Sequence, residues 1–585
     1  MSRKYRQRLQ QQLARELGTV RKDWQGRVTV ALLYPNRYYL GMSNLGFQTV
    51  YKEFNKLEEV VCERFFLPER EDIAAFSSKQ PLLSLESQRP LKDFAIAAFS
   101  VSFENDYPNL VHLLRLGCLT LYSSRRHQHE PLVVAGGVAT FINPEPIAPF
   151  VDLFLLGEAE DLLSRFIHSW QQGQQQKMSK STLLEQLACT VPGAYVPSLY
   201  RTQHYADGRL AAWEPLPPAP ARIKIARSKT SRQQPAVTTI VTPDTEFASA
   251  TLVELGRGCG RGCRFCAAGF VYRPVHFHSS HLVLRTVAEA GLPVDKVGLV
   301  SAAVSDHPEI DSLCLELRNQ GCNLTISSLR ADSLTPQLLE TLAASGLRSL
   351  AIAPEAGSER LRRVINKKLS EAQILDAAAA IFESGFVHLR LYFMVGLPTE
   401  TEEDVKAMVQ LVKRLKHTLL VVGRGRGRLG TITVSLNSFV PKPFTPFQWT
   451  GFCDLAVLKK RIRKIKRELA PVANVRVHAD VPRWAYNQAL LSRGDRRLAS
   501  LLEQLVKNQG NWPQAVKSVN VNPEFYVYRQ RQRDELLPWD FMDHSIDKGF
   551  LWREYQRALA EKTTPACVPE SCTACGVCPA GSTPS

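Results

Sequence analysis

The chain has 585 residues, of which 44% are apolar and 22% are charged. This composition excludes a disordered, collagen-like or coiled-coil protein, and the length predicts three or four domains of about 150 residues each. The net charge of +17 favours a polyanionic partner such as RNA, although a basic enzyme without such a partner would carry the same charge. No apolar run approaches the ~20 residues of a membrane span, and the basic start lacks a secretory signal pattern. We therefore expect a cytoplasmic protein without membrane contact.

Residues 1–213 alternate short apolar segments with amphipathic stretches. The expected strands lie at 27–35, 93–102, 131–137 and 152–160. Continuous apolar strands between helices are typical of a parallel sheet covered on both faces, so we predict a doubly wound, Rossmann-like α/β domain. Gly136 and Gly137 directly follow a strand, at the edge where such sheets bind ligands, although a tight turn explains them as well.

Residues 214–248 are Pro-rich, basic and aperiodic, which is typical of an inter-domain linker. Residues 249–440 then repeat a strand–helix unit six times, which predicts a partial (βα)6 barrel of the TIM type with its functional groups at the carboxyl ends of the strands. The expected helix caps are Thr335 before Pro336, Ser370 with Gln373, and Thr399 with Glu402. Gly321, Gly346 and Gly385 are expected to end helices.

Residues 441–560 predict a mixed, mostly helical extension, and residues 561–585 form a Cys-rich tail. The segment 455–469 has apolar residues at helical spacing, and Lys and Arg side chains cover its opposite face. A solvated helix face is the usual explanation of such a pattern. Together with the basic first residues and the Arg-rich segment 423–428, it favours RNA as a substrate.

A group of cysteines follows the first strand of the predicted barrel. Cys259, Cys263 and Cys266 have the spacing Cys-x-x-x-Cys-x-x-Cys, and three thiolates on one loop can hold three irons of a 4Fe–4S cube. The fourth iron is then free for chemistry. Neighbouring arginines would favour thiolates over thiols; these are Arg257, Arg261 and Arg264. A zinc site completed by His276 or His278 is the alternative, but zinc sites prefer paired Cys-x-x-Cys half-sites.

This motif, with the aromatic Phe265 before the last cysteine, resembles the signature of the radical S-adenosylmethionine superfamily. The resemblance extends over residues 249–440. It implies an enzyme, a transferase or oxidoreductase, whose free iron chelates S-adenosylmethionine. One electron then cleaves the sulfonium bond and releases a 5′-deoxyadenosyl radical. It also implies an electron donor such as flavodoxin or ferredoxin.

The resemblance further implies contacts with S-adenosylmethionine after successive strands. The Gly-Gly-Glu that family members often carry after the second strand is missing here, and Ser301 and Asp306 stand in its region. The segments 353–358 and 392–400 are similar to those of methylthiotransferase-like members. No catalytic residue is assigned. The cofactor-binding candidates are Phe265, Ser301, Asp306, Ser328, Arg330, Glu355, Arg390 and Gly396. A surface cap for Glu355 and a structural ion pair for Arg330 are the alternatives.

The order of a doubly wound domain before a radical barrel is similar to the cobalamin-domain class of the superfamily. More narrowly, several segments resemble a bacterial family of uncharacterised fused radical proteins. These segments are 41–51, 62–68, 143–146, 493–497 and 537–540. The usual cobalamin-ligand motif Asp-x-His-x-x-Gly is absent from the sequence. Cobalamin therefore either binds without a protein histidine or does not bind, and the domain then acts as a lid or substrate platform.

The tail carries a second cysteine motif, Cys-x-x-x-x-Cys-x-x-Cys-x-x-Cys. Its members are Cys567, Cys572, Cys575 and Cys578. Four thiolates can hold a second iron–sulfur cluster or a closed zinc site that pins the tail or grips RNA, and a redox-sensitive or disordered tail is a third interpretation. For the whole chain, we predict a radical enzyme that modifies a macromolecule, with methylation or methylthiolation of RNA as the leading reaction. The alternative is a non-catalytic iron–sulfur electron carrier or RNA-binding scaffold.

Overall fold

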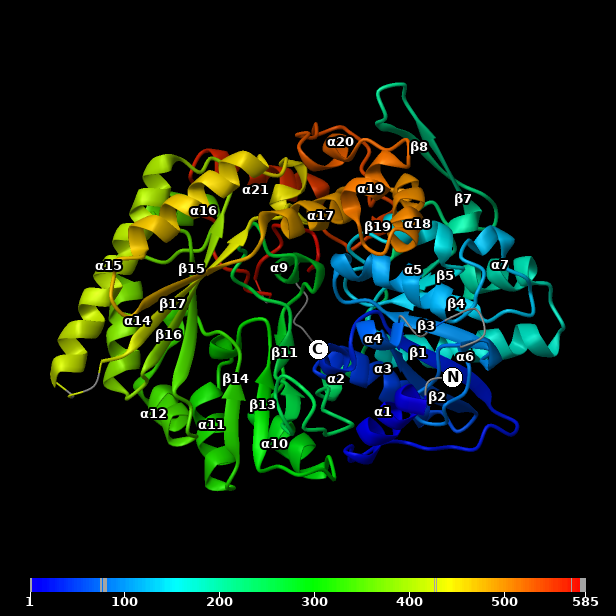
Figure 1. The fold of residues 1–585 in the computed structure, drawn as a ribbon, viewed down its shortest axis with the longest axis horizontal. Coiled ribbons are helices and arrows are strands. Elements are labelled where there is room, and N and C mark those ends of the chain that lie inside the picture. Colours follow the sequence, from blue (N-terminus) through cyan, green and yellow to red (C-terminus); the bar gives the residue numbers. More distant parts are fainter. Residues whose placement is uncertain are drawn as a thin grey trace.

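The computed structural model describes residues 3–73, 76, 81–425, 427, 429–569 and 571–578. Two α/β domains lie side by side, and a helical extension from the last quarter of the chain joins them along one edge (Figure 1). Within these described ranges, none of the helices combines the length and apolar character that a membrane span requires.

The first domain is built on a six-stranded sheet with the order β2-β1-β3-β4-β5-β6. Its strands are β1 (Val28–Tyr34), β2 (Val60–Phe66), β3 (Ile96–Ser100), β4 (Leu132–Gly136), β5 (Leu153–Leu155) and β6 (Ala194–Tyr195). The first five are parallel, and β6 is antiparallel to β5. The longer helices are α1 (Arg3–Ala14), α3 (Leu45–Lys56), α5 (Tyr107–Leu116), α6 (Ala159–Gln175) and α7 (Lys180–Thr190). The predicted α/β domain with parallel strands is confirmed.

The sequence pattern did not indicate two strands of this sheet, the two-residue β6 and the longer β2. All seven residues of β2 are buried, yet it carries Glu63 and Arg64 at its centre. The Arg64 guanidinium donates to the carboxylates of Glu16 and Glu86, 2.6 and 2.7 Å away, so its charge is compensated inside the protein. Because two charged residues interrupt the apolar run, the strand has neither a continuous apolar pattern nor an alternating one.

The segment between the two domains is folded against both. After the hairpin β7 (Tyr200–His204) and β8 (Leu210–Pro215), strand β9 (Ile223–Lys224) pairs with β19 (Met542–Asp543) of the extension. Val237 then bridges Val253 of the second domain, and Val241 bridges Leu17 near the start of the chain. These backbone pairs tie the expected linker to three parts of the molecule.

The second domain has two parallel sheets with the orders β10-β13-β14 and β15-β16-β17-β18, which contain all six predicted strands and one more. The strands are β10 (Thr251–Glu254), β13 (Lys296–Val300), β14 (Asn323–Ile326), β15 (Ser349–Glu355), β16 (His388–Val395), β17 (Thr431–Ser438) and β18 (Val475–Ala479). The short strands β11 (Gly256–Arg257) and β12 (His276–Phe277) form a separate antiparallel pair. One parallel bridge between Leu329 and Ile352 connects the two parallel sheets, so the row of strands is interrupted between β14 and β15.

Helices cover the outer side of these strands (Figure 1). They are α10 (Ser280–Glu289), α11 (Ile310–Asn319), α12 (Pro336–Ala344), α14 (Glu371–Glu383), α15 (Glu402–Gly425) and α16 (Leu455–Leu469). The caps at Thr335 and Ser370 are confirmed, and the latter forms a full capping box with Gln373. The cap predicted at Thr399 is wrong, because Thr399 has a φ of 63° and α15 begins at Glu402. Gly321, Gly346 and Gly385 have positive φ angles, as helix-ending glycines do.

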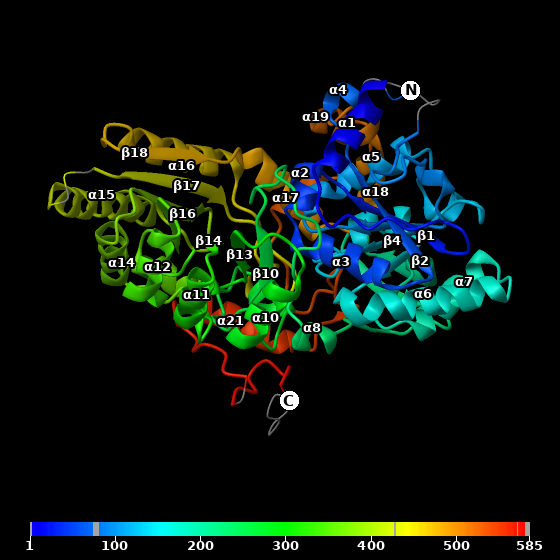
Figure 2. The ribbon, with the colours of Figure 1, turned by 90° about the horizontal axis from the view of Figure 1, so that it is seen from below.

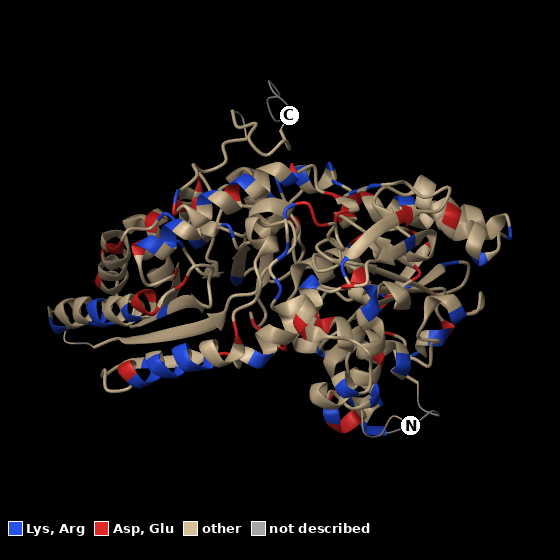
Figure 3. Cartoon of the chain, turned by 90° about the horizontal axis from the view of Figure 1, so that it is seen from above, with Lys and Arg blue, Asp and Glu red and all other residues tan. Residues whose placement is uncertain are grey.

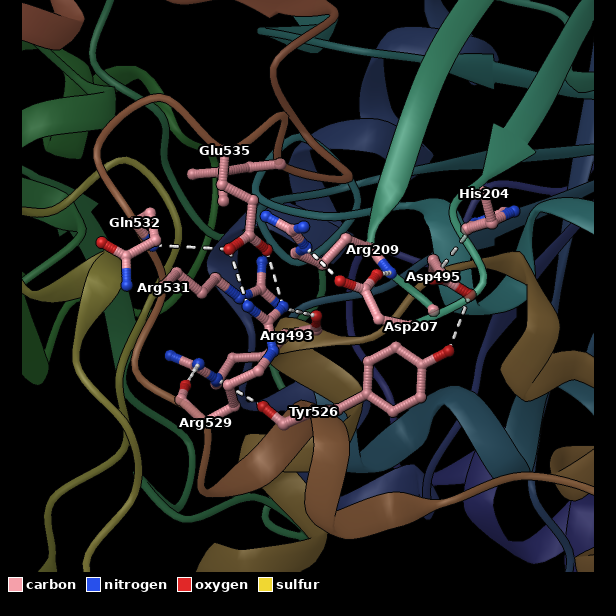
Figure 4. A network of polar contacts seen from close by, with 12 residues as sticks. His204, Asp207, Arg209, Arg493, Asp495, Tyr526, Arg529, Arg531, Gln532 and Glu535 are labelled. Carbon is pink, nitrogen blue, oxygen red and sulfur yellow. Dashed lines mark hydrogen bonds and ion pairs between the residues drawn. The ribbon is translucent and has the colours of Figure 1, made fainter.

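The extension contains α17 (Pro482–Arg493), α18 (Ala499–Lys507), α19 (Trp512–Lys517), α20 (Pro523–Val527) and α21 (Lys548–Leu559). A polar network holds it together around Arg493 (Figure 4). The fully buried Arg493 guanidinium donates to the backbone carbonyls of Tyr526 and Arg529, at 2.7 and 2.6 Å. Asp495 accepts from the Tyr526 hydroxyl at 3.1 Å and lies 3.7 Å from His204 of β7. Seen from below, α1 lies on the opposite side of the molecule from α21 (Figure 2).

Candidate functional site

The three-cysteine loop runs from the end of β10 to the short helix α9 (Ala268–Val271). Cys263 is buried, and Cys259 and Cys266 are half-buried. Gly258 has a φ of 82°, and a β-carbon there would lie 2.7 Å from the carbonyl oxygen of Tyr272. Only glycine fits such a position, so the backbone closes tightly around the thiols. The loop thus lies at the carboxyl end of the first strand, as predicted.

Burial keeps the thiols of Cys259 and Cys266 protonated when no metal is bound. It raises the pKa of Cys266 to about 11 and also raises the pKa of Cys259. The charge of Cys263 also raises the pKa of each of these two thiols, which indicates that the three sulfurs are close together. Backbone N–H groups of Arg261, Ala268 and Gly269 counteract the rise by bonding to sulfur. A metal would displace the thiol protons and would find these N–H groups already directed at the thiolates.

The donor set of this loop fits a 4Fe–4S cube. Among the described residues, no three His, Cys, Asp or Glu side chains are grouped so as to hold a single metal ion. A cube places each thiolate on a different iron, so its ligands are spread more widely than those of one tetrahedral ion. His276 of β12 (His276–Phe277) pairs with Arg257 of β11 (Gly256–Arg257), so the histidines of the zinc alternative lie beside the start of the loop. Among the described residues, however, they form no metal-binding group with its cysteines.

The loop arginines are paired with carboxylates, and two of them also interact with the charge of a loop thiol, Arg261 with Cys259 and Arg264 with Cys263. Arg257 pairs with Glu254 at 2.9 Å, Arg261 with Asp306 at 2.6 Å, and Arg264 with Glu554 at 3.1 Å. Their partners lie up to 290 positions away in the sequence, so the spacing around the cysteines could not indicate them. The charge of Arg330 also lowers the pKa of Cys259.

Two of the predicted cofactor-binding residues meet beside the loop. Asp306 accepts from Arg261, and Arg330 donates to both carboxylate oxygens of Asp332, at 2.9 and 3.0 Å. Asp332 also accepts from Arg261 at 3.1 Å. Both predicted residues are therefore close to the cysteines, but their charges are already paired within the protein.

Glu355 ends β15 in a strained conformation, with a φ of 66°. Its carboxylate pairs with Lys367 at 3.2 Å, and the Lys367 carbonyl accepts from Arg330 at 3.2 Å. This contact connects Glu355 to the polar residues around the loop. A non-glycine residue at positive φ needs strong support from its surroundings and is a marker of functional sites.

The other predicted residues are more scattered. Ser301 lines a cavity between the two domains, and Ser328 is exposed. Phe265 packs in an apolar cluster that contains Cys575 of the tail. Gly396 packs away from the thiols: a β-carbon there would lie 2.9 Å from the β-carbon of Cys453, and its N–H donates to Glu400.

The inner side of the parallel strands is polar and partly open. Residues of β16 and β17 alternate, so that one set is buried against the helices and the other is left half-buried or exposed. The second set includes the predicted residue Arg390. Its members on these strands are His388, Arg390, Tyr392, Met394, Thr431, Thr433, Ser435 and Asn437. In TIM barrels, apolar side chains fill this space, so the polar lining indicates room for a ligand.

A cavity of 610 Å³ lies between the carboxyl edge of the first sheet and the beginning of the second domain. Gly137, which the sequence placed at this edge, lines it with a φ of 102°. The charged residues of its lining are Glu158, Glu160, Glu254 and Arg257. Arg257 pairs with Glu254 of its own domain and with Glu160 of α6, so this ion-pair group joins the domains at the cavity wall.

Basic side chains line one face of α16, whose limits agree with the predicted segment. Figure 3 shows Lys and Arg along this helix. Two of its cations face inward: Arg461 pairs with Glu400 at 2.7 Å and Lys464 with Glu402 at 2.9 Å. Lys459, Lys460, Arg463, Lys466 and Arg467 are exposed. Within the Arg-rich segment 423–428, Arg426 and Arg428 lie outside the described residues.

Comparisons with known proteins match both domains to family models. Residues 46–197 match "Radical SAM proteins, N-terminal" and residues 253–412 match "Radical SAM superfamily". The chain is 30% identical over 487 residues to an uncharacterized protein of Methanocaldococcus jannaschii, covering 81% of this chain and 90% of that protein. It is 26% identical over 207 residues to the threonylcarbamoyladenosine tRNA methylthiotransferase MtaB of Treponema pallidum, covering 34% of this chain and 42% of that enzyme.

Among solved structures, the chain is similar to the radical S-adenosylmethionine methyltransferase TsrM from Kitasatospora setae, determined with cobalamin and a 4Fe–4S cluster bound. The TM-score is 0.49 at 11% sequence identity, and the match covers 84% of this chain and 99% of that one.

Proposed function

Because the chain belongs to the radical S-adenosylmethionine superfamily, we propose that it holds a 4Fe–4S cluster on Cys259, Cys263 and Cys266 and uses S-adenosylmethionine to modify a substrate by radical chemistry. The observation that carries the proposal is the set of three close thiols on one loop, which leaves one corner of a cube without a protein ligand. When bound, the cluster chelates S-adenosylmethionine and supplies the electron for its reductive cleavage to a 5′-deoxyadenosyl radical.

The residues of this chain then have separate tasks. The three thiolates hold the iron, and the N–H groups that bond to sulfur stabilise their negative charge. Arg330 and Asp306, held by ion pairs, border the space beside the loop, where they orient the methionine end of S-adenosylmethionine. The polar inner side of β16 and β17 binds the substrate, and the first domain limits the access of water.

The cysteine assignment is tested by anaerobic reconstitution of the full chain with iron and sulfide. After addition of dithionite and S-adenosylmethionine, we expect 5′-deoxyadenosine from the wild type and none from the Cys259→Ala, Cys263→Ala, Cys266→Ala variant. Cys189→Ala, which removes an exposed cysteine of α7, is the control and keeps the activity. Protein that holds only zinc at this loop, or that binds iron and sulfide without yielding 5′-deoxyadenosine, would contradict the proposal.

For the substrate, we propose RNA, with methylation or methylthiolation as the reaction. The five exposed cations of α16 support this choice, because phosphates favour clustered Lys and Arg. The similarity to a tRNA methylthiotransferase covers 34% of the chain and agrees with it.

The RNA proposal is tested with a charge reversal on that face. The variant Lys459→Glu, Lys460→Glu, Arg463→Glu should bind bulk tRNA more weakly. The slope of the logarithm of its binding constant against the logarithm of the salt concentration should also be smaller, by about 0.7–0.9 for each phosphate that the variant no longer neutralises. Lys52→Glu, Lys92→Glu, Lys177→Glu changes the net charge equally at exposed positions of the first domain and serves as the control. Equally weakened binding in both variants would show a general charge effect and argue against this interface.

We also propose that the 610 Å³ cavity takes cobalamin without a protein histidine ligand. The cavity lies at the carboxyl edge of the parallel sheet, where such domains bind cofactors, and no histidine is among its lining residues in the described chain. A neighbouring apolar pocket shares Val50 and Gly137 with it. Incubation of the apo protein with hydroxocobalamin, followed by desalting, should leave cobalamin absorbance with the protein. Protein without that absorbance would contradict cobalamin binding.

A further inference from the structure

The four cysteines after α21 gather beside the three-cysteine loop. Cys575 is 2% exposed, and the pKa of Cys567 is raised to about 11, first by burial and then by the charges of the other three thiols. The other three are Cys572, Cys575 and Cys578. The four thiols therefore lie near one another, but they are spread more widely than the ligands of a single metal ion.

We propose that Cys567, Cys572, Cys575 and Cys578 hold a second iron–sulfur cluster that passes single electrons to the cluster of the three-cysteine loop. The electron-transfer part rests on the function proposed above, and the metal site does not. The electron comes from a low-potential protein donor of the ferredoxin or flavodoxin class. The second cluster is reduced by one electron and is reoxidised when that electron moves on, so no bond is made or broken at the tail.

The spacing favours a cluster over a zinc ion. Cys572, Cys575 and Cys578 form an overlapping Cys-x-x-Cys-x-x-Cys series, as in bacterial ferredoxin-type clusters. Tetrahedral zinc sites are commonly made from two separate Cys-x-x-Cys pairs. The fourth thiol, Cys567, comes from five positions earlier in the chain and completes the set of ligands.

A direct hydrogen bond connects the two cysteine groups. The backbone N–H of Cys567 donates to the carbonyl oxygen of Gly260, 2.6 Å away, and Gly260 directly follows Cys259. A path of covalent bonds and this one hydrogen bond therefore runs from the sulfur of Cys567 to the sulfur of Cys259. A β-carbon at Gly260 would lie 2.9 Å from the Cys567 carbonyl oxygen, so the loop and the tail are in close contact at these two residues.

Polar side chains fix this arrangement. The fully buried Arg264 donates to the Lys562 carbonyl at 2.8 Å and to the Thr564 hydroxyl at 3.1 Å. Asn366 bonds to both groups: its amide nitrogen donates to the Gly262 carbonyl, and its oxygen accepts from the Thr564 N–H. The tail is therefore held at a fixed position relative to the loop.

A cation lies between the two sets of thiols. Arg273 is 5% exposed, its Nε donates to the Gly269 carbonyl at 2.7 Å, and its charge lowers the pKa of Cys567 and Cys578. Its terminal nitrogen Nη2 is 3.9 Å from the position of a β-carbon on Gly262. A fixed positive charge there stabilises the added electron on either cluster.

The tail group is also the more accessible of the two. The thiols themselves are alike, because each group contains one buried cysteine, Cys575 or Cys263. Thr573, Ala574 and Gly576, between the tail cysteines, are exposed, whereas the residues between the loop cysteines are half-buried or buried. A protein donor can therefore approach the second cluster directly. This difference in access gives the electron a direction, from the tail toward the loop.

The metal site is tested on the full chain after anaerobic reconstitution. We expect about eight irons and eight sulfides per chain in the wild type, and about four of each in Cys572→Ala, Cys575→Ala. The Cys259→Ala, Cys263→Ala, Cys266→Ala variant should keep about four of each, with the Mössbauer spectrum of a cubane. Cys189→Ala should keep the wild-type content. Zinc without sulfide in the loop variant, or no metal, overturns the proposal.

This result is independent of the function proposed above, because the loop variant lacks the site of S-adenosylmethionine cleavage. Failure of that function would appear instead as a loaded wild type that yields no 5′-deoxyadenosine. The two failures are therefore distinguishable.

Electron transfer is tested with Gly260→Ala, whose β-carbon would push the Cys567 carbonyl away. We expect unchanged iron content and a slowing of at least about tenfold in the reduction of the loop cluster by reduced ferredoxin. Freeze-quench electron paramagnetic resonance measures the reduction of that cluster over time. Its signal is identified by its change when S-adenosylmethionine is added. Gly425→Ala, with open space around its β-carbon, is the matched control. A wild-type rate in Gly260→Ala overturns the electron path.

Discussion

Asp106, at the carboxyl edge of the first sheet, is a buried carboxyl group that accepts hydrogen bonds from neutral amides. The Asn36 amide donates to it at 2.7 Å and the Asn109 amide at 3.4 Å. Burial raises its pKa from 3.8 to about 7, and the charge of Glu104 adds to the rise. The folded state therefore holds a proton that the unfolded chain releases in this range.

Because Asp106 is protonated in the folded state at a pH where the unfolded chain has released the proton, we expect the stability to depend on pH. The contribution of Asp106 is present below pH 3.8 and is lost as the pH rises through about 7. The free energy of unfolding should fall by about 2–3 kcal/mol between about pH 5 and pH 8 from this group. Asp106→Asn imitates the protonated form and should remove that fall, as measured by urea unfolding at both pH values. Asp93→Asn, at an exposed carboxylate, is the control; an unchanged slope in Asp106→Asn would refute the assignment.

At this scale, the sequence indicated the metal-binding residues but not the roles of their neighbours. The cysteines were recognisable because their spacing is local. Arg264 was expected to favour thiolates, yet its partner Glu554 lies 290 positions away. The tasks of such residues are set by long-range contacts, which a local pattern does not contain.

At the scale of elements, Gly357 marks the contact between the end of β15 and helix α15. A β-carbon there would lie 2.2 Å from the backbone nitrogen of Met408, an overlap that a side-chain rotation cannot relieve. Gly357→Ala should therefore displace α15 and lower the free energy of unfolding by about 1–3 kcal/mol.

Thermal unfolding of the apo protein measures this effect. Gly425→Ala, at the end of the same helix, has nothing within 4 Å of its β-carbon and should leave the unfolding temperature unchanged or slightly higher. Equal unfolding temperatures for both variants would contradict the close contact of α15 with β15.

The elements that the sequence indicated are those with a clear period. Helix α16 was predictable to its end residues because its apolar positions repeat regularly. Strand β18 was not, because it is short and alternates between exposed and half-buried residues at the end of the strand order β15-β16-β17-β18. Strand β2 was hidden by the buried Arg64, whose partners Glu16 and Glu86 belong to other segments.

At the scale of the whole molecule, two segments that lie about 350 residues apart in the sequence meet. The Asn143 amide donates to the carbonyls of Ser492 and Gly494, at 3.0 and 2.9 Å. Arg496 pairs with Glu145 at 2.8 Å and also donates to the Tyr195 hydroxyl. Residues 143–146 and 493–497 thus form one joint between the first domain and the extension, which neither segment alone could reveal.

Breaking this joint should loosen the molecule. Arg496→Ala leaves the buried Glu145 without its cation, which costs about 3–5 kcal/mol. We expect earlier thermal unfolding and faster limited proteolysis between the first domain and the extension. Arg201→Ala, at an exposed position on β7, provides the comparison and should behave like the wild type. A proteolysis rate for Arg496→Ala equal to that of the comparison variant would refute the role of the joint.

Arg264 also has a consequence for the order in which the protein matures. Its guanidinium reaches from the iron-binding loop to Glu554 of α21 and to the carbonyl of Lys562. Without those acceptors, the buried cation would keep the carbonyls of Arg363 and Val364 but lose its carboxylate, so the loop attains its final shape only once the C-terminal helix has packed. Iron loading would therefore follow, rather than guide, the folding of the last part of the chain.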